Sequence, residues 1–377
     1  MTAVFGKWHL GDLKPLSQAM ALPASNPGQN GFDVWKVTER AVPTATPNCG
    51  CYNMSQCILG HYKRRQEEEE VIPCTNYHSA LPGDPTNTLP YDSLILQDDS
   101  NFIVDELLNF ISNVTANGST EQPFFAYVPF HAVHKNYIAT PPFSLQYSSS
   151  RDLSQAEVDY FGVISAMDTA VGRIRSSLQK MGISSNTMLW FTSDNGPAVR
   201  SPGSTGGLRG SKGTLFEGGI RVPGIIEWPQ VIGSNRQVST PVVTNDFLPT
   251  VCDILGIGPP EGRPLDGESI LPLLLNKGEN EQRSSSIKWA FKIKDGRFRG
   301  SYQVAVITNQ NFKLIASYRK EKVIESKLYD LSRDPAETAD VSTQHQDLFK
   351  ELLKEVESWR LSVKESAVSR VRCHTES

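Results

Sequence analysis

The pair Asp194-Asn195 sets a carboxylate beside an amide oxygen at the end of a short apolar run, residues 187–193 (TMLWFTS). Oxygen donors of this kind suit a hard cation such as Ca²⁺ or Mg²⁺. Lys212 follows in a glycine-rich segment, residues 208–223 (LRGSKGTLFEGGIRVP), where small residues leave room for a ligand to reach backbone amides. Together these residues predict a site for a cation and an anion. An ordinary turn remains the alternative for Asp-Asn-Gly-Pro, because all four residue types favour turns.

A lysine and three histidines could contribute to the same chemistry. Lys7 and His9 are two residues apart, so that in an extended segment they point to the same side and could grip a tetrahedral anion. For this pair alone, an exposed lysine beside an ordinary histidine remains an alternative. His131 and His134 leave the end of an apolar run, residues 123–130 (PFFAYVPF). That position predicts that at least one of the two lines a cleft.

The elements expected around these residues alternate between strands and helices. Residues 2–5, 123–130 and 187–193 have the β-branched and aromatic composition of buried strands. A helix is expected over residues 101–112, and residues 154–157 (SQAE) form a capping box that opens another helix. The apolar face of this second helix is expected to carry Phe161, Ile164, Met167, Val171, Ile174 and Leu178. This order is typical of an α/β fold with a parallel sheet covered on both faces, in which chemistry lies beyond the carboxyl ends of the strands.

A change of pattern after residue 284 predicts two domains. Residues 1–284 are expected to form the α/β domain, within which residues 12–99 are rich in Pro, Asn, Gly and Cys and are expected to be long irregular surface structure. Residues 285–377 combine short β-prone runs with a final amphipathic helix, which predicts a smaller α+β subdomain with a small antiparallel sheet. The apolar face of the final helix is expected to carry Leu348, Leu352, Val356 and Trp359.

The charge balance and the hydropathy argue against two classes of function. The chain has 37 Lys and Arg residues against 41 Asp and Glu residues, a net charge of −4, whereas general nucleic-acid binding needs a basic surface. No apolar run approaches the length of about 18 residues that a membrane span requires. Residues 1–10 (MTAVFGKWHL) also lack the basic and apolar regions of a secretory signal.

Four cysteines crowd into one stretch of the chain: Cys49, Cys51, Cys57 and Cys74. A zinc site is one interpretation, but these spacings differ from the paired Cys-x-x-Cys patterns of such sites. A loop tied by disulfides fits the spacing better. Sequons for N-glycosylation, which are compatible with an oxidising secretory route, begin at Asn53, Asn113 and Asn117. We therefore expect an extracellular or lysosomal location.

Seven segments, taken in order, resemble the sulfatase family. They are residues 6–11 (GKWHLG), 123–134 (PFFAYVPFHAVH), 191–197 (FTSDNGP), 208–223, 246–250 (DFLPT), 265–274 (LDGESILPLL) and 328–337 (LYDLSRDPAE). The chain looks closer to the arylsulfatase branch than to phosphatases of the same fold. Such a phosphatase would need a Thr or Ser nucleophile and a two-metal site rich in Asp and His, and residues 190–221 hold too few of these ligands.

The resemblance implies an alkaline-phosphatase-like fold, with a mixed and mostly parallel sheet covered by helices. It also implies a sulfuric ester hydrolase that acts on a sulfated small molecule or a sulfated glycan through a Ca²⁺-assisted covalent intermediate. In that family pattern Asp194 and Asn195 would be ligands of Ca²⁺.

The same resemblance assigns catalytic roles to four basic residues. Lys7 and His9 would contact the nucleophile and the sulfate, and His9 would also be the base that helps to expel sulfate. His134 and Lys212 would hold the sulfate and meet the negative charge that develops on the leaving oxygen. Lysines stabilise such charge, and histidine exchanges protons near neutral pH.

The chain departs from the family pattern at the nucleophile. Sulfatases of this type convert a cysteine or serine to formylglycine within a Cys/Ser-x-Pro/Ala-x-Arg segment, and no cysteine or serine of this sequence satisfies that pattern. The paired aspartates with which the family completes its metal site would lie before Met1, so half of the expected Ca²⁺ shell is missing. A further family histidine has no clear counterpart among residues 34–47.

Two explanations fit this departure. The chain is either an N-terminally incomplete copy of a sulfatase or a natural non-catalytic relative that binds sulfated glycans. Residues 2–5 favour the first explanation, because they have the pattern of the middle of a strand that leads into the Lys7 loop. Under both explanations we expect the chain alone to be inactive as a sulfatase.

Overall fold

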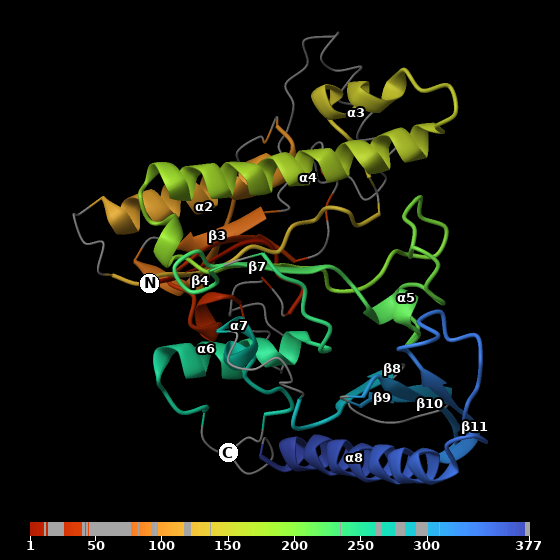
Figure 1. Ribbon diagram of the computed structural model, residues 1–377. Coiled ribbons are helices and arrows are strands. Elements are labelled where there is room, and N and C mark those ends of the chain that lie inside the picture. Colours follow the sequence, from red (N-terminus) through yellow and green to blue (C-terminus); the bar gives the residue numbers. More distant parts are fainter. Residues whose placement is uncertain are drawn as a thin grey trace. The chain divides into compact units, whose positions relative to one another are not determined.

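The computed structural model divides the chain into two compact units, Met1–Ser185 and Asn186–Ser377, which are described one at a time. Figure 1 gives the element labels used below. The structure describes residues 1–10, 13, 26–39, 42, 44, 77–81, 83–91, 95, 97–116, 122–135, 137–233, 235–260, 265–275, 283–291, 301–308 and 310–373.

The first unit is built on a five-stranded mixed sheet in the order β4-β3-β2-β1-β5. Its strands are β1 (Thr2–Lys7), β2 (Val34–Thr38), β3 (Tyr77–Leu81), β4 (Asp84–Pro90) and β5 (Phe125–Tyr127). β1 pairs in parallel with β2 on one side and with β5 on the other, whereas β3 and β4 are antiparallel additions. The middle of β1 is fully buried, as expected for a central parallel strand. The predicted strand over residues 2–5 is therefore confirmed.

Strands β2, β3 and β4 correct the expectation that residues 12–99 are irregular. Their sequences are short, and β4 (DPTNTLP) is polar with prolines at its second and last positions. Such a sequence carries no alternating apolar pattern, so its strand character depends on pairing with β3 rather than on its own residues. The rest of this stretch, with Cys49, Cys51, Cys57, Cys74 and Asn53, lies outside the described residues.

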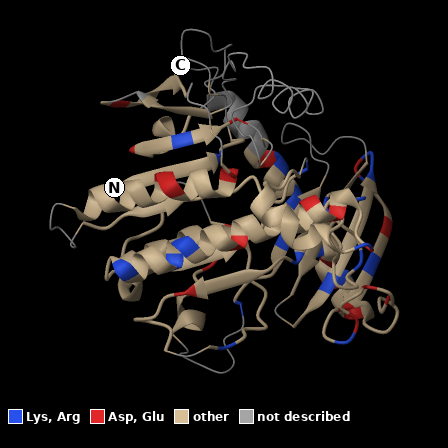
Figure 2. Ribbon diagram, turned by 90° about the horizontal axis from the view of Figure 1, so that it is seen from above, with Lys and Arg blue, Asp and Glu red and all other residues tan. Residues whose placement is uncertain are grey.

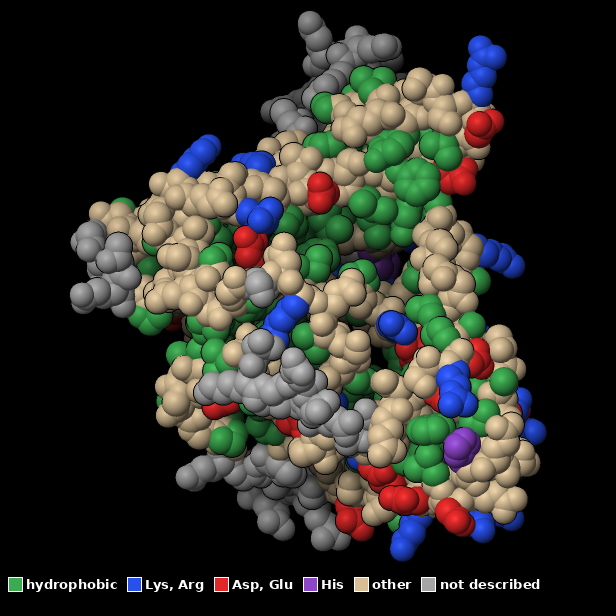
Figure 3. All heavy atoms as spheres, viewed as in Figure 1, with side chains coloured by type: hydrophobic (Ala, Val, Ile, Leu, Met, Phe, Trp, Pro, Cys, Tyr) green, Lys and Arg blue, Asp and Glu red, His purple; other side chains and the backbone are tan. Residues whose placement is uncertain are grey.

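Within the described residues, the first unit contains the helices α2 (Asp99–Thr115), α3 (Pro141–Ser148) and α4 (Gln155–Lys180). α2 contacts both β1 and α4, and α3 contacts α4 (Figure 1). The predicted capping box is present, since Ser154 and Glu157 bond each other's backbone amides. Figure 3 shows apolar side chains gathered over α3 and the adjoining part of α4, where Leu145 is 66% exposed. Asn113, one of the three sequon residues, is exposed on α2.

The buried face of α4 differs from the predicted face at its start. Val163, Ala166 and Ala170 are fully buried there, while Ile164 and Met167 are half-exposed. The predicted and the observed face agree at Ile174 and Leu178, which are buried. Small side chains line the close contact with α3, because a Cβ added at Gly162 would lie 2.5 Å from Ala139 Cβ, just before α3, and 3.2 Å from Ser144 N within it. Close packing between helices therefore outweighs side-chain size in deciding which face is buried.

The second unit begins with a two-stranded antiparallel sheet of β6 (Leu189–Thr192) and β7 (Gly224–Glu227). We expected the run 187–193 to join a parallel sheet, but within the described residues β6 is bonded only to β7. The antiparallel pairing follows from the linking segment, which folds back on itself through the bond from Gly196 N to Gly219 O at 3.0 Å. The short helices described next along the chain are α5 (Glu217–Ile220), α6 (Phe247–Leu255) and α7 (Leu271–Leu274). Cys252 of α6 is buried and forms no disulfide.

A four-stranded antiparallel sheet and a long helix make up the C-terminal part of the second unit. The sheet has the order β11-β10-β9-β8, with β8 (Ile287–Phe291), β9 (Ser301–Ile307), β10 (Phe312–Arg319) and β11 (Lys322–Asp330). The helix is α8 (Gln346–Cys373), whose Leu352 and Val356 are buried on one face of this sheet and whose Leu348 and Trp359 pack beside them. The predicted apolar face of the last helix and the predicted small C-terminal sheet are thus confirmed.

Basic and acidic residues are mixed along the helices and strands in Figure 2. Among the helices that the structure describes, none is both long and apolar enough to cross a membrane. Short 3₁₀ turns occupy Gly28–Asn30, Ser184–Asn186 and Thr244–Asp246.

Candidate active site

Lys7 and His9 lie where the central strand of the first unit ends. Lys7 is the last residue of β1, and its amide donates to Pro129 O at 2.8 Å, while the amide of Trp8 donates to Thr38 O at 2.8 Å. The indole of Trp8 is buried and packs edge-on against Phe32. His9 is exposed and has a left-handed φ of 47°, so the chain turns there. Lys7 and His9 are therefore held at the carboxyl end of β1 by the anchored residue between them.

Gly6 brings this strand end against the segment that bears His134. Its φ is 122°, and a Cβ at this position would lie 2.1 Å from Pro129 O. Only glycine permits so close an approach of the two backbones. The structure thus brings Lys7 and the loop after β5 to one edge of the sheet, beyond the carboxyl ends of parallel strands.

His134 is exposed on a tight turn. Its amide donates to His131 O at 2.7 Å, and its Nδ1 lies 2.6 Å from the carbonyl oxygen of Lys135. Because a carbonyl oxygen only accepts, Nδ1 must be the nitrogen that carries the proton in the neutral ring. Protonation of the ring then takes place at Nε2, which would become a donor to an anion.

His131 has a different environment, which the sequence did not reveal. It is fully buried, with Nδ1 at 2.5 Å from Asp99 Oδ2 and Nε2 at 2.7 Å from Thr38 Oγ1. The Tyr77 hydroxyl donates to Asp99 Oδ1 at 2.5 Å, and burial together with Asp99 raises the pKa of Tyr77 well above its usual value. An acid, a histidine and a hydroxyl in a row resemble a hydrolytic triad. Thr38 is fully buried, however, so no substrate reaches it, and these residues support the His134 turn instead.

Asp98 adds a second buried carboxyl group beside Asp99. Its Oδ1 caps α2 by accepting from Ser100 N at 2.9 Å, but its Oδ2 has no hydrogen-bond partner among the described residues. Burial raises the pKa of Asp98 from 3.8 to about 7, and the neighbouring Asp99 charge adds to that effect.

In the second unit, Asp194 and Asn195 follow directly after β6. Asp194 is exposed and Asn195 is half-buried, and Asn195 Nδ2 donates to Asp194 Oδ1 at 2.7 Å. This bond uses the amide nitrogen, so that the amide oxygen and a carboxylate oxygen remain as donors of the type that Ca²⁺ prefers. The described residues contain no group of three or more His, Cys, Asp or Glu side chains that could hold a metal ion. The donor types therefore fit a hard cation, while these two residues supply only part of its shell.

The structure joins the Lys212 loop to the Asp194-Asn195 turn. The amide of Lys212 donates to Pro197 O at 2.8 Å, and Lys212 itself is exposed. A Cβ at Gly196 would lie 1.9 Å from Gly218 O. We expected the glycines to admit a ligand to the backbone, whereas Gly196 instead lets the two protein segments pack backbone to backbone.

The six predicted site residues thus fall into two groups. Lys7, His9 and His134 lie in segments that meet within Met1–Ser185, and Asp194, Asn195 and Lys212 meet within Asn186–Ser377. The structure brings together the members of each group. The combined set of six stays a prediction.

Two further segments that resemble the family have a supporting role. Asp246 is fully buried and pairs with Arg283, whose Nη1 and Nη2 donate to its two carboxylate oxygens at 2.6 and 2.9 Å. Glu268 N donates to Asp246 Oδ1 at 3.0 Å, and Ile270 N donates to Thr250 Oγ1 at 3.0 Å. Residues 246–250 and 265–274 are therefore tied together around one buried ion pair.

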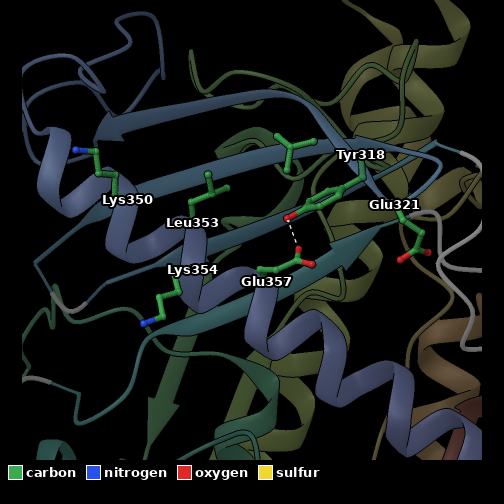
Figure 4. A pocket seen from close by; sticks show the side chains of 7 residues that line it. Tyr318, Glu321, Lys350, Leu353, Lys354 and Glu357 are labelled. Atoms are coloured by element: carbon green, nitrogen blue, oxygen red, sulfur yellow. Dashed lines mark hydrogen bonds between the residues drawn. The ribbon is translucent and has the colours of Figure 1, made fainter.

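A shallow pocket of about 410 Å³ lies between α8 and the β10–β11 hairpin (Figure 4). Across it the Tyr318 hydroxyl donates to Glu357 Oε2 at 3.2 Å, and Arg360 binds the same carboxylate. Its lining consists of Tyr318, Glu321, Val323, Lys350, Leu353, Lys354 and Glu357. None of the six predicted site residues lines this pocket.

Similarity to known families covers most of the chain. The family described as Sulfatase matches residues 1–257. The chain belongs to the sulfatase family. A second family, described as N-sulphoglucosamine sulphohydrolase, C-terminal, matches residues 211–362 of this sulfatase chain. The predicted family is thereby confirmed.

Curated relatives of this sulfatase chain carry several substrate names. A sulfatase of Formosa agariphila is 32% identical over 279 residues, which are 68% of this chain and 49% of the relative. The N-acetylgalactosamine-6-sulfatase of Canis lupus familiaris is 30% identical over 282 residues, 73% of this chain and 46% of that protein. The steryl-sulfatase of Rattus norvegicus is 36% identical over 170 residues, 43% of this chain and 28% of that protein. The chain spans about half the length, or less, of these relatives.

Solved structures confirm the fold class of this sulfatase chain. A crystal structure of Ps i-CgsB in complex with a neocarrahexaose has a TM-score of 0.71 at 23% identity and covers 95% of this chain and 71% of that one. The phosphonate monoester hydrolase of Agrobacterium radiobacter has a TM-score of 0.56 at 18% identity, covering 97% and 78%. At such identities the likeness shows the fold alone, which is the predicted alkaline-phosphatase-like α/β fold.

Proposed function

We propose that this chain supplies the sulfate-binding residues and part of the metal shell of a sulfuric ester hydrolase. The observation that carries the proposal is the bond from Lys212 N to Pro197 O, which ties an exposed lysine to a turn with two oxygen donors. A cation and a flexible ammonium group on adjacent backbone segments can share one anionic ligand. Family membership makes a sulfate ester the expected ligand.

Asp194 and Asn195 would hold Ca²⁺ through their side-chain oxygens. The ion takes about six to eight oxygens, so water, substrate or other residues would complete the shell. When bound, it would stabilise negative charge on the sulfate group.

The four basic residues would act on the sulfate itself. Lys7 and Lys212 would donate to sulfate oxygens and stabilise charge that spreads during cleavage of the sulfur–oxygen bond. His134, with its Nδ1 proton bound to Lys135 O, would donate from a protonated Nε2 to the leaving oxygen. His9, exposed at the turn after β1, would be the base that accepts a proton when sulfate is expelled.

The nucleophile is absent from these 377 residues, because no Cys/Ser-x-Pro/Ala-x-Arg segment occurs in them. We therefore expect the chain to bind sulfated ligands without turning them over. The alternative of a non-catalytic, glycan-binding protein involves the same residues and also predicts binding without turnover. The extracellular or lysosomal location also stays a prediction.

Binding of a defined probe tests the site. The probe is an oligosaccharide with 6-O-sulfated N-acetylgalactosamine, titrated calorimetrically with Ca²⁺ against its unsulfated counterpart. We expect micromolar affinity for the sulfated form only, weakened about tenfold or more by Lys212→Ala or His134→Ala, because each removes a charge-assisted hydrogen bond. Lys180→Ala, at an exposed lysine at the end of α4, is the matched control. Unchanged binding in both site variants would refute the assignment.

Turnover separates the enzyme from the binding protein. The 377-residue chain should not hydrolyse 4-nitrophenyl sulfate, and measurable hydrolysis would contradict the missing nucleophile. A chimaera that places the N-terminal portion of the Formosa agariphila sulfatase before residue 1 should gain activity. A chimaera that binds the sulfated probe but stays inactive would favour the non-catalytic alternative.

A further inference from the structure

Lys313 of β10 is a fully buried lysine in the second unit. Its Nζ lies 2.9 Å from Glu217 Oε1 and 2.9 Å from Glu337 Oε1, and the Glu337 side chain is also fully buried. A buried ammonium group is costly unless it is paired and hydrogen-bonded, so these contacts are a requirement of the fold. Lys313 cannot reach a substrate, which excludes it as a sulfate ligand.

Glu337 bonds to the chain on both sides of Lys212. Its Oε2 accepts from the amide of Glu217 at 2.7 Å, and its carbonyl oxygen accepts from Arg209 Nη1 at 2.8 Å. The Arg209 guanidinium also lies 4.0 Å from the ring centre of Phe216. One glutamate therefore fixes the start and the end of the Lys212 loop, residues 209–217.

Apolar contacts dock the same loop on the C-terminal sheet. Leu215 is buried against Ala305, Ile315 and Tyr329. Alternate residues of β10 point to opposite faces, so that Lys313 and Ile315 face the loop while Leu314 and Ala316 face α8. The sheet thus has one face for its own helix and one for the loop that presents Lys212.

We propose that Glu337 and Lys313 are positioning residues for Lys212, so that the C-terminal sheet sets the geometry of the sulfate-binding lysine. The proposal rests on the proposed role of Lys212 in sulfate binding. The proposal also assigns a structural role to the segment 328–337. This segment resembles the family but contains none of the six predicted site residues.

The test combines binding with the mobility of the loop. Glu337→Gln keeps the shape of the side chain and removes its charge, and Glu325→Gln, at an exposed ion pair on β11, is the control. We expect Glu337→Gln to weaken binding of the sulfated oligosaccharide about tenfold and to speed amide hydrogen exchange in residues 208–220, with β9 and β10 still protected. The control should change neither quantity.

A double substitution distinguishes positioning from general stability. If Glu337 acts through Lys212, then Lys212→Ala should cost little further affinity in the Glu337→Gln background, because the lysine is already misplaced. Fully additive losses, or unchanged exchange in residues 208–220, would overturn the proposal. Arg209→Gln, on the other side of the loop, should likewise weaken binding, speed exchange in residues 208–220 and leave little further loss to Lys212→Ala. This variant replaces Glu337→Gln in the test if Glu337→Gln does not fold. If Lys212→Ala alone leaves binding unchanged, the proposed function fails instead, while the exchange measurement still tests the positioning of the loop.

Discussion

The two groups of site residues rest on different chemistry. In Met1–Ser185, the turn that bears His134 lies on a chain of hydrogen bonds from Thr38 through His131 to Asp99. In Asn186–Ser377, the loop that bears Lys212 lies on ion pairs between Lys313 and two glutamates. Both supports are buried, and both join segments that are distant in sequence.

Burial raises the pKa of a carboxyl group in each unit, and among the described residues a buried lysine offsets this effect at Glu337 of the second unit. The pKa of Asp98 rises to about 7 through burial, and the charge of Asp99 adds to the rise. Burial also raises the pKa of Glu337, and Lys313 offsets part of that rise. The first unit thus favours an uncharged Asp98 beside Asp99. The second unit depends on the opposite charges of Lys313 and its two glutamates. Removal of one charge should therefore have opposite effects in the two units.

The largest effect is expected for Lys313→Met in the second unit. The substitution leaves Glu217 and Glu337 buried without their cation and should cost about 3 to 5 kcal/mol of unfolding free energy. Hydrogen exchange of β9 and β10 in increasing urea measures this for the second unit alone. Lys327→Met is the control, because its pair with Glu325 is exposed and should contribute less than about 1 kcal/mol. Equal losses in the two variants would remove the distinction between the units.

In the first unit, Asp98→Asn should stabilise the protein at neutral and higher pH. The folded pKa of Asp98 is about 7 against 3.8 for the free group, so the folded state holds this proton more tightly than the unfolded state. Its stabilising contribution is complete below about pH 4 and is lost as the pH rises through about 7. Asparagine still caps α2 and has no charge to bury, so the variant should gain up to roughly 4 kcal/mol at pH 8.

Urea unfolding of the first unit between pH 4 and 8 measures this gain. The difference between the variant and the natural chain should grow with pH. Asp84→Asn, at a half-exposed residue whose carboxyl group accepts hydrogen bonds from Thr86 that lower its pKa, should show no such gain. Parallel stability curves for Asp98→Asn and the natural chain would show that this acid carries no burial penalty.

Local patterns in the sequence predicted several elements of the fold. The apolar run 123–130 ends at the loop of His134, the capping box at Ser154 starts α4, and α8 buries its apolar stripe. In each case a few neighbouring residues carry the signal. The polar strand β4 and the buried face of α4 were missed because pairing and close packing decide them.

The supports of the site could not be predicted from local patterns. Lys313 and Glu217 are 96 residues apart, and Thr38 and His131 are 93 residues apart. A lysine within β10 would ordinarily be assigned to solvent, because an unpaired charge is rarely buried. Only the fold reveals that Glu217 and Glu337 meet it.

The smallest effect is expected for Tyr77→Phe, which removes one neutral donor from the first unit. Asp99 loses the hydroxyl at 2.5 Å but keeps His131, so the cost should be about 1 to 2 kcal/mol, less than for Lys313→Met. Hydrogen exchange of β1 and α2 in increasing urea measures this loss of unfolding free energy. Tyr160→Phe is the control, because that buried ring packs edge-on against Tyr137 and the substitution keeps this ring contact. A loss as large as that of Lys313→Met would mean that the first unit depends on each partner as strictly as the second, because its hydrogen bonds would then act as one cooperative network.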